Sequence, residues 1–354
     1  MRVTMKQLAE ESGVSTATVS YVLNNGPRMV SEDTRARVQS AMTRMNYSPS
    51  AIARGMTRKR MDTFGVVYTN YIDLSPTGYF TSVLHGILTC SMDHKQNIML
   101  FTDKLQDDIT QNINLWCDGR CDGLILIAPP HDNRIFDMLK KRHMKFVVIG
   151  DSSLPDDISY TDVDNVLAAC EMTNYLLKMG HVNISILLGD AYISSTIQRL
   201  QGFKQSLSEA GIAFREEMAI SGRYNETSGF EMIQQILRLP RHLQPTALFC
   251  CSDEIAQGAL QALNQAEIPV PEEMSLVGFD DIITAALMQP ALTTVRQPLE
   301  VLGKRAAEIL LEQLQAETPH EVQEFLPAVI VERQSAAPPM KYSQRSRITD
   351  YISG

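Results

Sequence analysis

The chain has 354 residues, more than one domain of ordinary size, and a net charge of −9. This charge is unevenly spread, because residues 1–60 hold 10 Lys and Arg against 4 Asp and Glu, whereas the remainder holds 22 against 37. A basic segment joined to an acidic body is typical of a nucleic-acid-binding module fused to another kind of domain. No signal-peptide pattern opens the chain and no apolar run is long enough to span a membrane, so we expect a cytoplasmic protein.

Two helices are predicted at the start of the chain. Thr4 and Gln7 have the spacing of a capping box, and Gly13 is a suitable end for the helix that follows it. Ser15 is a suitable N-cap for a second helix, because a serine hydroxyl can accept a backbone N–H of the first turn. A short Gly-containing turn therefore joins two short helices.

The second helix has two contrasting faces. Val19, Val22 and Leu23 recur at the i, i+3, i+4 spacing of a buried face. The opposite face carries small or polar side chains that let a helix approach base edges: Thr16, Ala17, Ser20, Tyr21 and Asn24. A third helix begins at Ser31 and has its own apolar stripe, formed by Val38, Ala41, Met42 and Met45. The basic charge and this polar face favour a DNA-binding helix-turn-helix module over a generic three-helix bundle.

A hinge helix is predicted within residues 48–62. Pro49 suits the first turn of a helix. The helical run is too short to be stable by itself, and Gly55 weakens it further. We therefore expect this hinge to fold only against DNA or against a partner chain.

These segments resemble the LacI/GalR family of bacterial transcription regulators, in the motifs V-T-M-K-Q-L-A, G-V-S-T-A-T-V-S, V-L-N, V-S-x-x-T-R and N-Y-x-P-S-A-I-A-R. The resemblance implies that Thr16, Ala17 and Tyr21 read bases in the major groove, while Ala53 and Met56 enter the minor groove. It also implies a set of contacts to the DNA backbone: Thr4, Ser15, Thr18, Asn24, Ser31, Thr34 and Tyr47.

Three positions depart from the family pattern. Tyr21 stands where the family commonly has Arg, so a bidentate contact to guanine is missing and the operator preference should differ there. Met56 replaces the usual leucine wedge but is apolar and of similar size. The loop from residue 24 to 30 is one residue longer than is usual in the family. We expect Arg28 in this loop to add a contact to a phosphate or a base.

Strand-like apolar runs alternate with amphipathic helices through the body, residues 63–341. The predicted strands span 64–69, 98–102, 124–128, 146–150, 184–188, 247–251 and 275–279, and helices such as 166–179, 198–210, 228–239 and 254–266 lie between them. Alternating strands and helices predict an α/β fold with parallel sheets covered on both faces. There are enough strands for two sheets.

Polar residues follow the predicted strands, at Asn70, Asp103, Asp151, Asp190, Asp253 and Asp280. Open α/β sheets bind ligands beyond the carboxyl ends of their strands, so these side chains should face a shared crevice. Helix capping explains any one of them about equally well, and Asp190 and Asp253 have the most cap-like positions. Both interpretations stay open at each position.

The family resemblance extends through the body, in R-L-Q-G-F around Arg199 and in V-G-F-D-D-I followed by P-A-L-T-T-V-R-Q-P. It implies a periplasmic-binding-protein-like fold of type I, with one subdomain at about 63–162 plus 294–325 and the other at about 163–293 plus 326–341. Effector contacts are implied for Tyr79, Phe80, Asp151, Arg199, Tyr224, Ser252 and Asp280.

The residues implied to contact the effector suit a sugar. An aromatic face packs on the sugar's C–H surface, while Arg and Asp bond its hydroxyls. A purine sandwiched between Phe80 and Tyr224 is the alternative. Each member also has a plainer interpretation, since Phe80 and Tyr224 can simply pack in the cleft wall and Arg199 can be a structural partner of Asp. No cofactor is expected, and Cys117 and Cys121 lack the further ligands of a metal site.

The sequence therefore predicts a homodimeric, effector-controlled regulator, most simply a repressor, that binds a pseudo-palindromic double-stranded operator. A periplasmic solute receptor would share the body but has no use for the head, residues 1–47. An enzyme would need more than Asp280 and Asp281 beside Arg199, since no nucleophile–base motif accompanies them and Asp281 is expected to cap a helix. The tail, residues 342–354, lacks the leucine heptads of a tetramerising coiled coil.

Overall fold

The computed structural model describes residues 3–24, 30–48, 55, 60–68, 78–101, 109–318 and 320–340. The chain divides into two compact units, Met1–Asp62 and Thr63–Gly354. Ala53 and Met56 of the predicted hinge, Arg28 of the long loop and the tail lie outside the described residues. Within the described residues no helix has both the length and the apolar character needed to cross a membrane.

The first unit contains the three predicted helices, α1 (Met5–Ser12), α2 (Thr16–Asn24) and α3 (Glu32–Arg44). Both halves of the capping box between Thr4 and Gln7 are present, and Gly13 ends α1 in the left-handed conformation. A small core joins the helices, made by Leu8, Ala9, Val19, Val22, Val38 and Ala41. The apolar stripes predicted on α2 and α3 are therefore confirmed as the faces that pack together.

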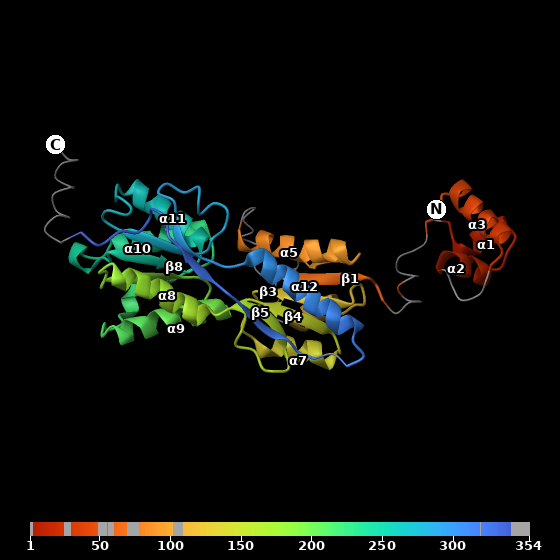
Figure 1. Ribbon diagram of the computed structural model, residues 1–354, viewed down its shortest axis with the longest axis horizontal. Helices are drawn as coiled ribbons and strands as arrows, with labels where there is room; N and C mark the ends of the chain where they lie inside the picture. Colours follow the sequence, from red (N-terminus) through yellow and green to blue (C-terminus); the bar gives the residue numbers. More distant parts are fainter. Residues whose placement is uncertain are drawn as a thin grey trace. The chain divides into compact units, whose positions relative to one another are not determined.

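The second unit has two α/β lobes (Figure 1). The first lobe is built on a sheet in the order β11-β5-β4-β3-β1-β2, all parallel. Its strands are β1 (Thr63–Tyr68), β2 (Asn97–Phe101), β3 (Gly123–Ile127), β4 (Lys145–Ile149), β5 (Ser159–Val163) and β11 (Gln323–Leu326). One face is covered by α5 (Tyr79–Asp93) and α12 (Leu299–Gln315), and the other by α6 (Ile109–Trp116) and α7 (Asn133–Lys141).

The second lobe repeats this plan. Its sheet has the order β12-β10-β9-β8-β6-β7, and only the β10–β12 pair is antiparallel. The strands are β6 (Ile184–Leu188), β7 (Ala219–Ser221), β8 (Ala247–Cys250), β9 (Ser275–Asp280), β10 (Thr293–Arg296) and β12 (Val329–Val331). Helices α8 (Asn165–Lys178) and α9 (Ser194–Glu209) cover one face, and α10 (Glu226–Leu237) and α11 (Asp253–Gln265) cover the other. Two 3₁₀ turns span Glu216–Met218 and Arg241–Leu243.

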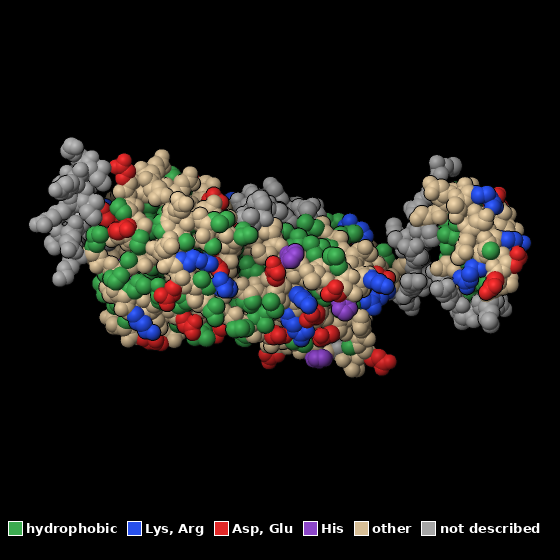
Figure 2. Space-filling view, turned by 45° about the horizontal axis from the view of Figure 1, so that its top comes forward, with side chains coloured by type: hydrophobic (Ala, Val, Ile, Leu, Met, Phe, Trp, Pro, Cys, Tyr) green, Lys and Arg blue, Asp and Glu red, His purple; other side chains and the backbone are tan. Residues whose placement is uncertain are grey.

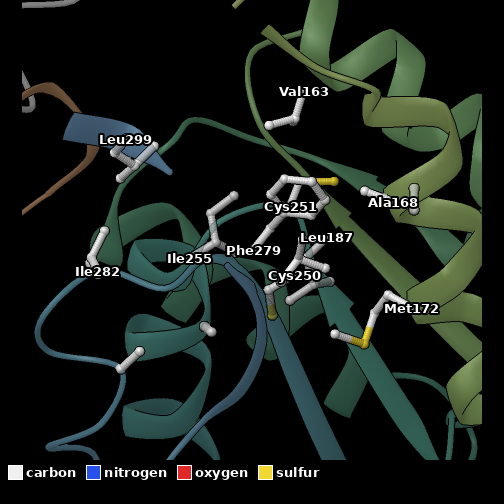
Figure 3. Packing of buried hydrophobic residues seen from close by; sticks show 14 of the residues in the cluster. Val163, Ala168, Met172, Leu187, Cys250, Cys251, Ile255, Phe279, Ile282 and Leu299 are labelled. Carbon is white, nitrogen blue, oxygen red and sulfur yellow. The ribbon is translucent and has the colours of Figure 1, made fainter. Parts of the chain in front are cut away.

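The chain crosses between the lobes three times, after β5, after β10 and after β11. One apolar cluster runs across these crossovers and joins the two cores. Figure 3 shows part of this cluster, including Val163 at the end of β5, Leu299 at the start of α12, and Phe279 of β9 next to Cys251. The carboxyl ends of the strands of both sheets are thereby held close to the lobe junction, where open α/β sheets bind ligands.

The seven predicted strands are present as β1, β2, β3, β4, β6, β8 and β9. Two details of the prediction were wrong. The second crossover was expected at residue 294, but β10 pairs with β9, so the chain leaves the second lobe only after Arg296. The helix expected from residue 198 begins at Ser194, four residues earlier, which places its first turn at the lobe junction.

Candidate DNA-binding face and effector cavity

The outer face of α2 is available for contact with DNA. Thr16 and Ala17 are exposed, and Thr18 and Tyr21 are half-buried, while Val19 is fully buried on the opposite side and anchors the helix. Asn24 lies in the last turn of α2, and its side chain is outside the described residues. The residues predicted to read bases thus share a single surface of the head.

Five of the seven residues predicted to contact the DNA backbone lie at helix N-termini. Thr4 and Ser31 cap α1 and α3, and the Ser15 hydroxyl accepts the backbone N–H of Thr18 at 3.1 Å at the start of α2. A helix N-terminus presents unpaired N–H groups and a positive dipole end, which is the usual setting for a phosphate. Thr18 and Thr34 occupy the first turns, whereas Tyr47 packs partly against the head core.

A cavity lined by residues of both lobes lies between the lobes of the body. Five of the seven residues predicted to contact effector line it, namely Tyr79, Arg199, Tyr224, Ser252 and Asp280. The remaining lining comes from residues that were not predicted: Tyr68, Ala128, Gly150, Asp162, Ile193, Ser195, Glu254 and Gln297. Phe80 and Asp151 are not part of the lining.

Arg199 lies on α9 at the base of the cavity and is 4% exposed. Its Nε donates to Asn165 Oδ1 at 2.9 Å, and a second nitrogen donates to the carbonyl of Cys251. The guanidinium carbon lies 3.6 Å from the centre of the Phe279 ring, and the shortest approach to Asp280 Oδ1 is 3.8 Å. Neutral acceptors therefore hold Arg199 more closely than its carboxylate neighbour does.

Two buried carboxyl groups, those of Asp162 and Asp280, line the cavity together with Arg199. Burial raises the pKa of Asp162 to about 7 and that of Asp280 to about 6, although Arg199 lowers both. Asp162 accepts hydrogen bonds from the Val163 N–H and the Asn165 amide, and Asp280 accepts from Gln297 Nε2 at 2.6 Å. Both acids thus change charge close to neutral pH.

Three tyrosine rings form the apolar part of the wall. Tyr68, at the end of β1, stacks on Phe80 with ring centroids 4.5 Å apart. The hydroxyl of Tyr224 is held by Thr196 Oγ1 at 2.8 Å and Ser195 Oγ at 3.3 Å. Its ring lies on Gly189, where an added Cβ would come within 2.2 Å of it, so only glycine fits there. Phe80 packs behind Tyr68 in the core, and Tyr68 occupies the position in the cavity wall that was predicted for Phe80.

The expectation that Asp253 caps a helix was wrong, because Ser252 takes that role. Ser252 is the N-cap of α11, with its hydroxyl accepting the Ile255 N–H, while the Asp253 carboxylate accepts from the Ile282 N–H and from Thr294 Oγ1. The expectation that Asp281 caps a helix was wrong. Its carboxylate instead pairs with two arginines of the second lobe, at 2.6 Å and 2.7 Å, which are Arg296 and Arg333.

Asp151 takes part in direct contacts between the lobes. Its Oδ1 accepts from the hydroxyl of Ser153 at 2.6 Å, and that hydroxyl lies 3.1 Å from the hydroxyl of Ser194 on the second lobe. An isolated antiparallel bridge joins Pro130 and Ile193 beside it. Asp151 therefore supports the junction at the cavity edge. Among the described residues no three metal-ligating side chains are grouped as a metal site.

The signals that would have revealed the unpredicted residues are weak. Asp162 lies in β5, whose sequence S-Y-T-D-V is too polar to be recognised as a buried strand. Glu254 looks like an ordinary acidic residue in the first turn of a helix. Gln297 follows β10, a strand of only four residues. Each of them can be recognised as a cavity residue only when the two sheets are placed next to each other in the fold.

A helix-turn-helix head joined to a two-lobed body with a central cavity defines a ligand-controlled DNA-binding regulator. Family models match both parts: that for the bacterial regulatory proteins of the lacI family covers residues 4–50, and that for the periplasmic binding protein-like domain covers residues 173–336. The chain is 31% identical to the repressor PurR of Actinobacillus pleuropneumoniae serotype 3 (strain JL03), covering 93% of this chain and 97% of that one. It is 30% identical to the ribose operon repressor of Escherichia coli (strain K12), covering 94% and 99%. The chain belongs to the LacI family of bacterial regulatory proteins.

Solved structures agree on the architecture. A complex of the transcriptional regulator CelR with cellobiose matches with a TM-score of 0.73 and 26% identity, covering 95% of this chain and all of that one. The lac repressor dimer bound to operator and the anti-inducer ONPF matches over the same shares with a TM-score of 0.83, and at 24% identity it shows the same fold. The predicted architecture of a helical head and a two-lobed body with parallel sheets is confirmed.

Proposed function

We propose that this protein is a cytoplasmic transcriptional repressor whose two heads, in a homodimer, bind a pseudo-palindromic operator under the control of a sugar-like effector. The observation that carries the proposal is the cavity between the lobes, where aromatic rings and hydrogen-bonding groups of both lobes face one space. The described lining residues include no nucleophile–base pair, which fits a receptor rather than an enzyme.

The wall favours a sugar over a purine. The sandwich of a purine between Phe80 and Tyr224 cannot form, because Phe80 is turned into the core and stacks on Tyr68. A sugar needs one apolar face and several hydrogen-bonding groups around its rim, and the cavity offers both. Cellobiose, which is bound in the CelR complex, is a ligand of this kind.

Control of DNA binding follows from the position of the cavity. An effector that contacts both lobes binds one arrangement of the lobes more tightly than another, and it shifts their population by that difference in affinity. The contacts of Ser153 with Ser194 and of Pro130 with Ile193 are among those that lobe movement would make or break. This geometry is compatible with an effector that lowers operator affinity and equally with one that raises it.

Operator recognition is tested by selecting binding sites from random DNA with the full-length protein. We expect pseudo-palindromic sites, and loss of specific binding by a fragment comprising residues 63–354. Tyr21→Ala should weaken the selected site by about 1–3 kcal/mol and relax the preference at one base pair per half-site, measured by fluorescence anisotropy.

A matched control is Tyr192→Ala, because Tyr192 is an exposed tyrosine of the body. It should leave operator affinity unchanged. Equal operator affinity of the full-length protein and the 63–354 fragment would overturn the proposed function.

A further inference from the structure

The cavity is lined by more acids than bases. Asp162 of β5, Asp280 of β9 and Glu254 of α11 line it, and Arg199 is the one basic residue in the described lining. On the face of the body seen in Figure 2, by contrast, Lys and Arg are interspersed with Asp and Glu. The acidic character of the cavity is therefore local.

Arg199 does not neutralise these acids closely. Its donors are directed at Asn165 and at the Cys251 carbonyl, and its distance to Asp280 Oδ1 is longer than a hydrogen bond. Its flat face is covered by Phe279. The shortest contacts of Arg199 are therefore with neutral groups, and its ion pair with Asp280 is the longer one.

The two buried acids of the lining accept side-chain hydrogen bonds from neutral groups. Asp162, 2% exposed, is bonded by an amide, and so is Asp280, 3% exposed. Burial of a carboxylate without a close counter-charge costs free energy, which is why the pKa of each is raised. A cation supplied by the ligand would remove this cost.

The aromatic lining suits a cation as well. Tyr68, Tyr79 and Tyr224 surround the same space, and the faces of aromatic rings attract ammonium groups. Aromatic rings and carboxylates together recognise an ammonium group more strongly than either does alone, because both present negative potential. The hydroxyl of Ser195 and the amide of Gln297 remain suited to ligand hydroxyls.

We propose that the effector carries a protonated amino group, as an amino sugar does, and that Asp162 and Asp280 hold this group. The inference rests on the proposed function, because it concerns the ligand of the same cavity. It also predicts discrimination against phosphorylated sugars, which would place an anion among carboxylates.

Binding should depend on pH with an optimum near neutrality. The groups facing the ligand are Asp162, Asp280, Glu254, Arg199 and the tyrosines of the wall. An ammonium group favours ionised carboxylates, so affinity rises as pH increases through the pKa values of Asp280 and Asp162, about 6 and about 7. Above about pH 8 a sugar amine loses its own proton, as an α-amino group does, and affinity falls again.

The test is thermal shift and calorimetry on the full-length protein with matched ligands at pH 7. Glucosamine, galactosamine and mannosamine are compared with the parent hexoses and with the hexose 6-phosphates. We expect at least one amino sugar to bind about tenfold or more tightly than its parent, since hydrogen bonds to charged groups are the stronger ones. Asp162→Asn should remove most of this preference and the rise in affinity between pH 6 and 7.

The matched control is Asp157→Asn, which removes an exposed carboxylate of the first lobe and should leave the preference intact. A parent sugar or a phosphate that binds as well as the amino sugar, or amino sugars that all fail to bind, would overturn the inference. If a neutral sugar binds and alters operator binding, the proposed function stands and this inference fails. If the full-length protein selects no operator, the proposed function itself fails.

Discussion

Replacing Arg199 by alanine should lower the free energy of unfolding by about 3 kcal/mol at pH 8 and abolish the thermal shift given by effector. The variant loses the hydrogen bonds to Asn165 and Cys251 and leaves Asp280 and Asp162 without their nearest cation. At neutral pH these acids would then bind protons, and a protonated carboxyl group cannot hold an ammonium group.

The loss of stability should depend on pH in a definite direction. Asp162 and Asp280 have raised pKa values in the folded protein, so their stabilising protonation is complete below the unfolded pKa and is lost as pH rises through the folded values. Removing Arg199 raises both folded values further. The destabilisation should therefore be smaller at pH 5 than at pH 8, measured by urea unfolding at each pH.

Arg134→Ala is the matched control, because Arg134 pairs with Asp132 on the surface of the body. It should change neither the stability nor the effector shift appreciably. An Arg199→Ala protein that lost equal stability at pH 5 and pH 8, or kept its full effector shift, would contradict the role given to Arg199.

Replacing Gly258 by valine should destabilise the second lobe by about 3 kcal/mol. A Cβ at Gly258 of α11 would lie 1.8 Å from the carbonyl oxygen of Glu226, and one at Gly229 of α10 would lie 2.1 Å from that of Ile255. The paired glycines let the two helices touch backbone to backbone, so any side chain must push them apart.

Urea unfolding monitored by circular dichroism measures this effect. The control is Gln261→Val, which places the same β-branched residue at an exposed position of the same helix and should cost only a few tenths of a kcal/mol. Equal midpoints for the two variants would show that the helices tolerate separation, contrary to the packing described above.

Much of the fold could be predicted from local patterns. Capping residues such as Thr4 and Ser31 mark helix starts, and apolar runs such as the one in β3 mark buried strands, because both signals lie within a few residues. The strand β5 could not be predicted, since its polar residues are buried for reasons that only the tertiary fold supplies. Thr161, for example, donates to the carbonyl of Leu302, 141 residues away.

The cavity was predicted less completely than the fold. Tyr79 and Phe80 were both expected to contact effector, but adjacent residues on a helix point about 100° apart, so only one of them can face the cavity. Tyr68 takes the other aromatic place because β1 ends beside α5. Asp162 and Glu254, which define the charge of the cavity, carry no motif of their own and are brought together only by the meeting of two lobes.

The central claim is that effector and operator binding are coupled, and reciprocal titration tests it most directly. Operator affinity of the full-length protein is measured by fluorescence anisotropy with and without a saturating ligand that shifts the melting temperature. Ligand affinity is then measured with and without the selected operator. We predict that the operator changes the dissociation constant of the ligand, and the ligand that of the operator, by the same factor, between about 5 and 150. A ligand that occupies the cavity and leaves operator affinity unchanged would contradict the claim.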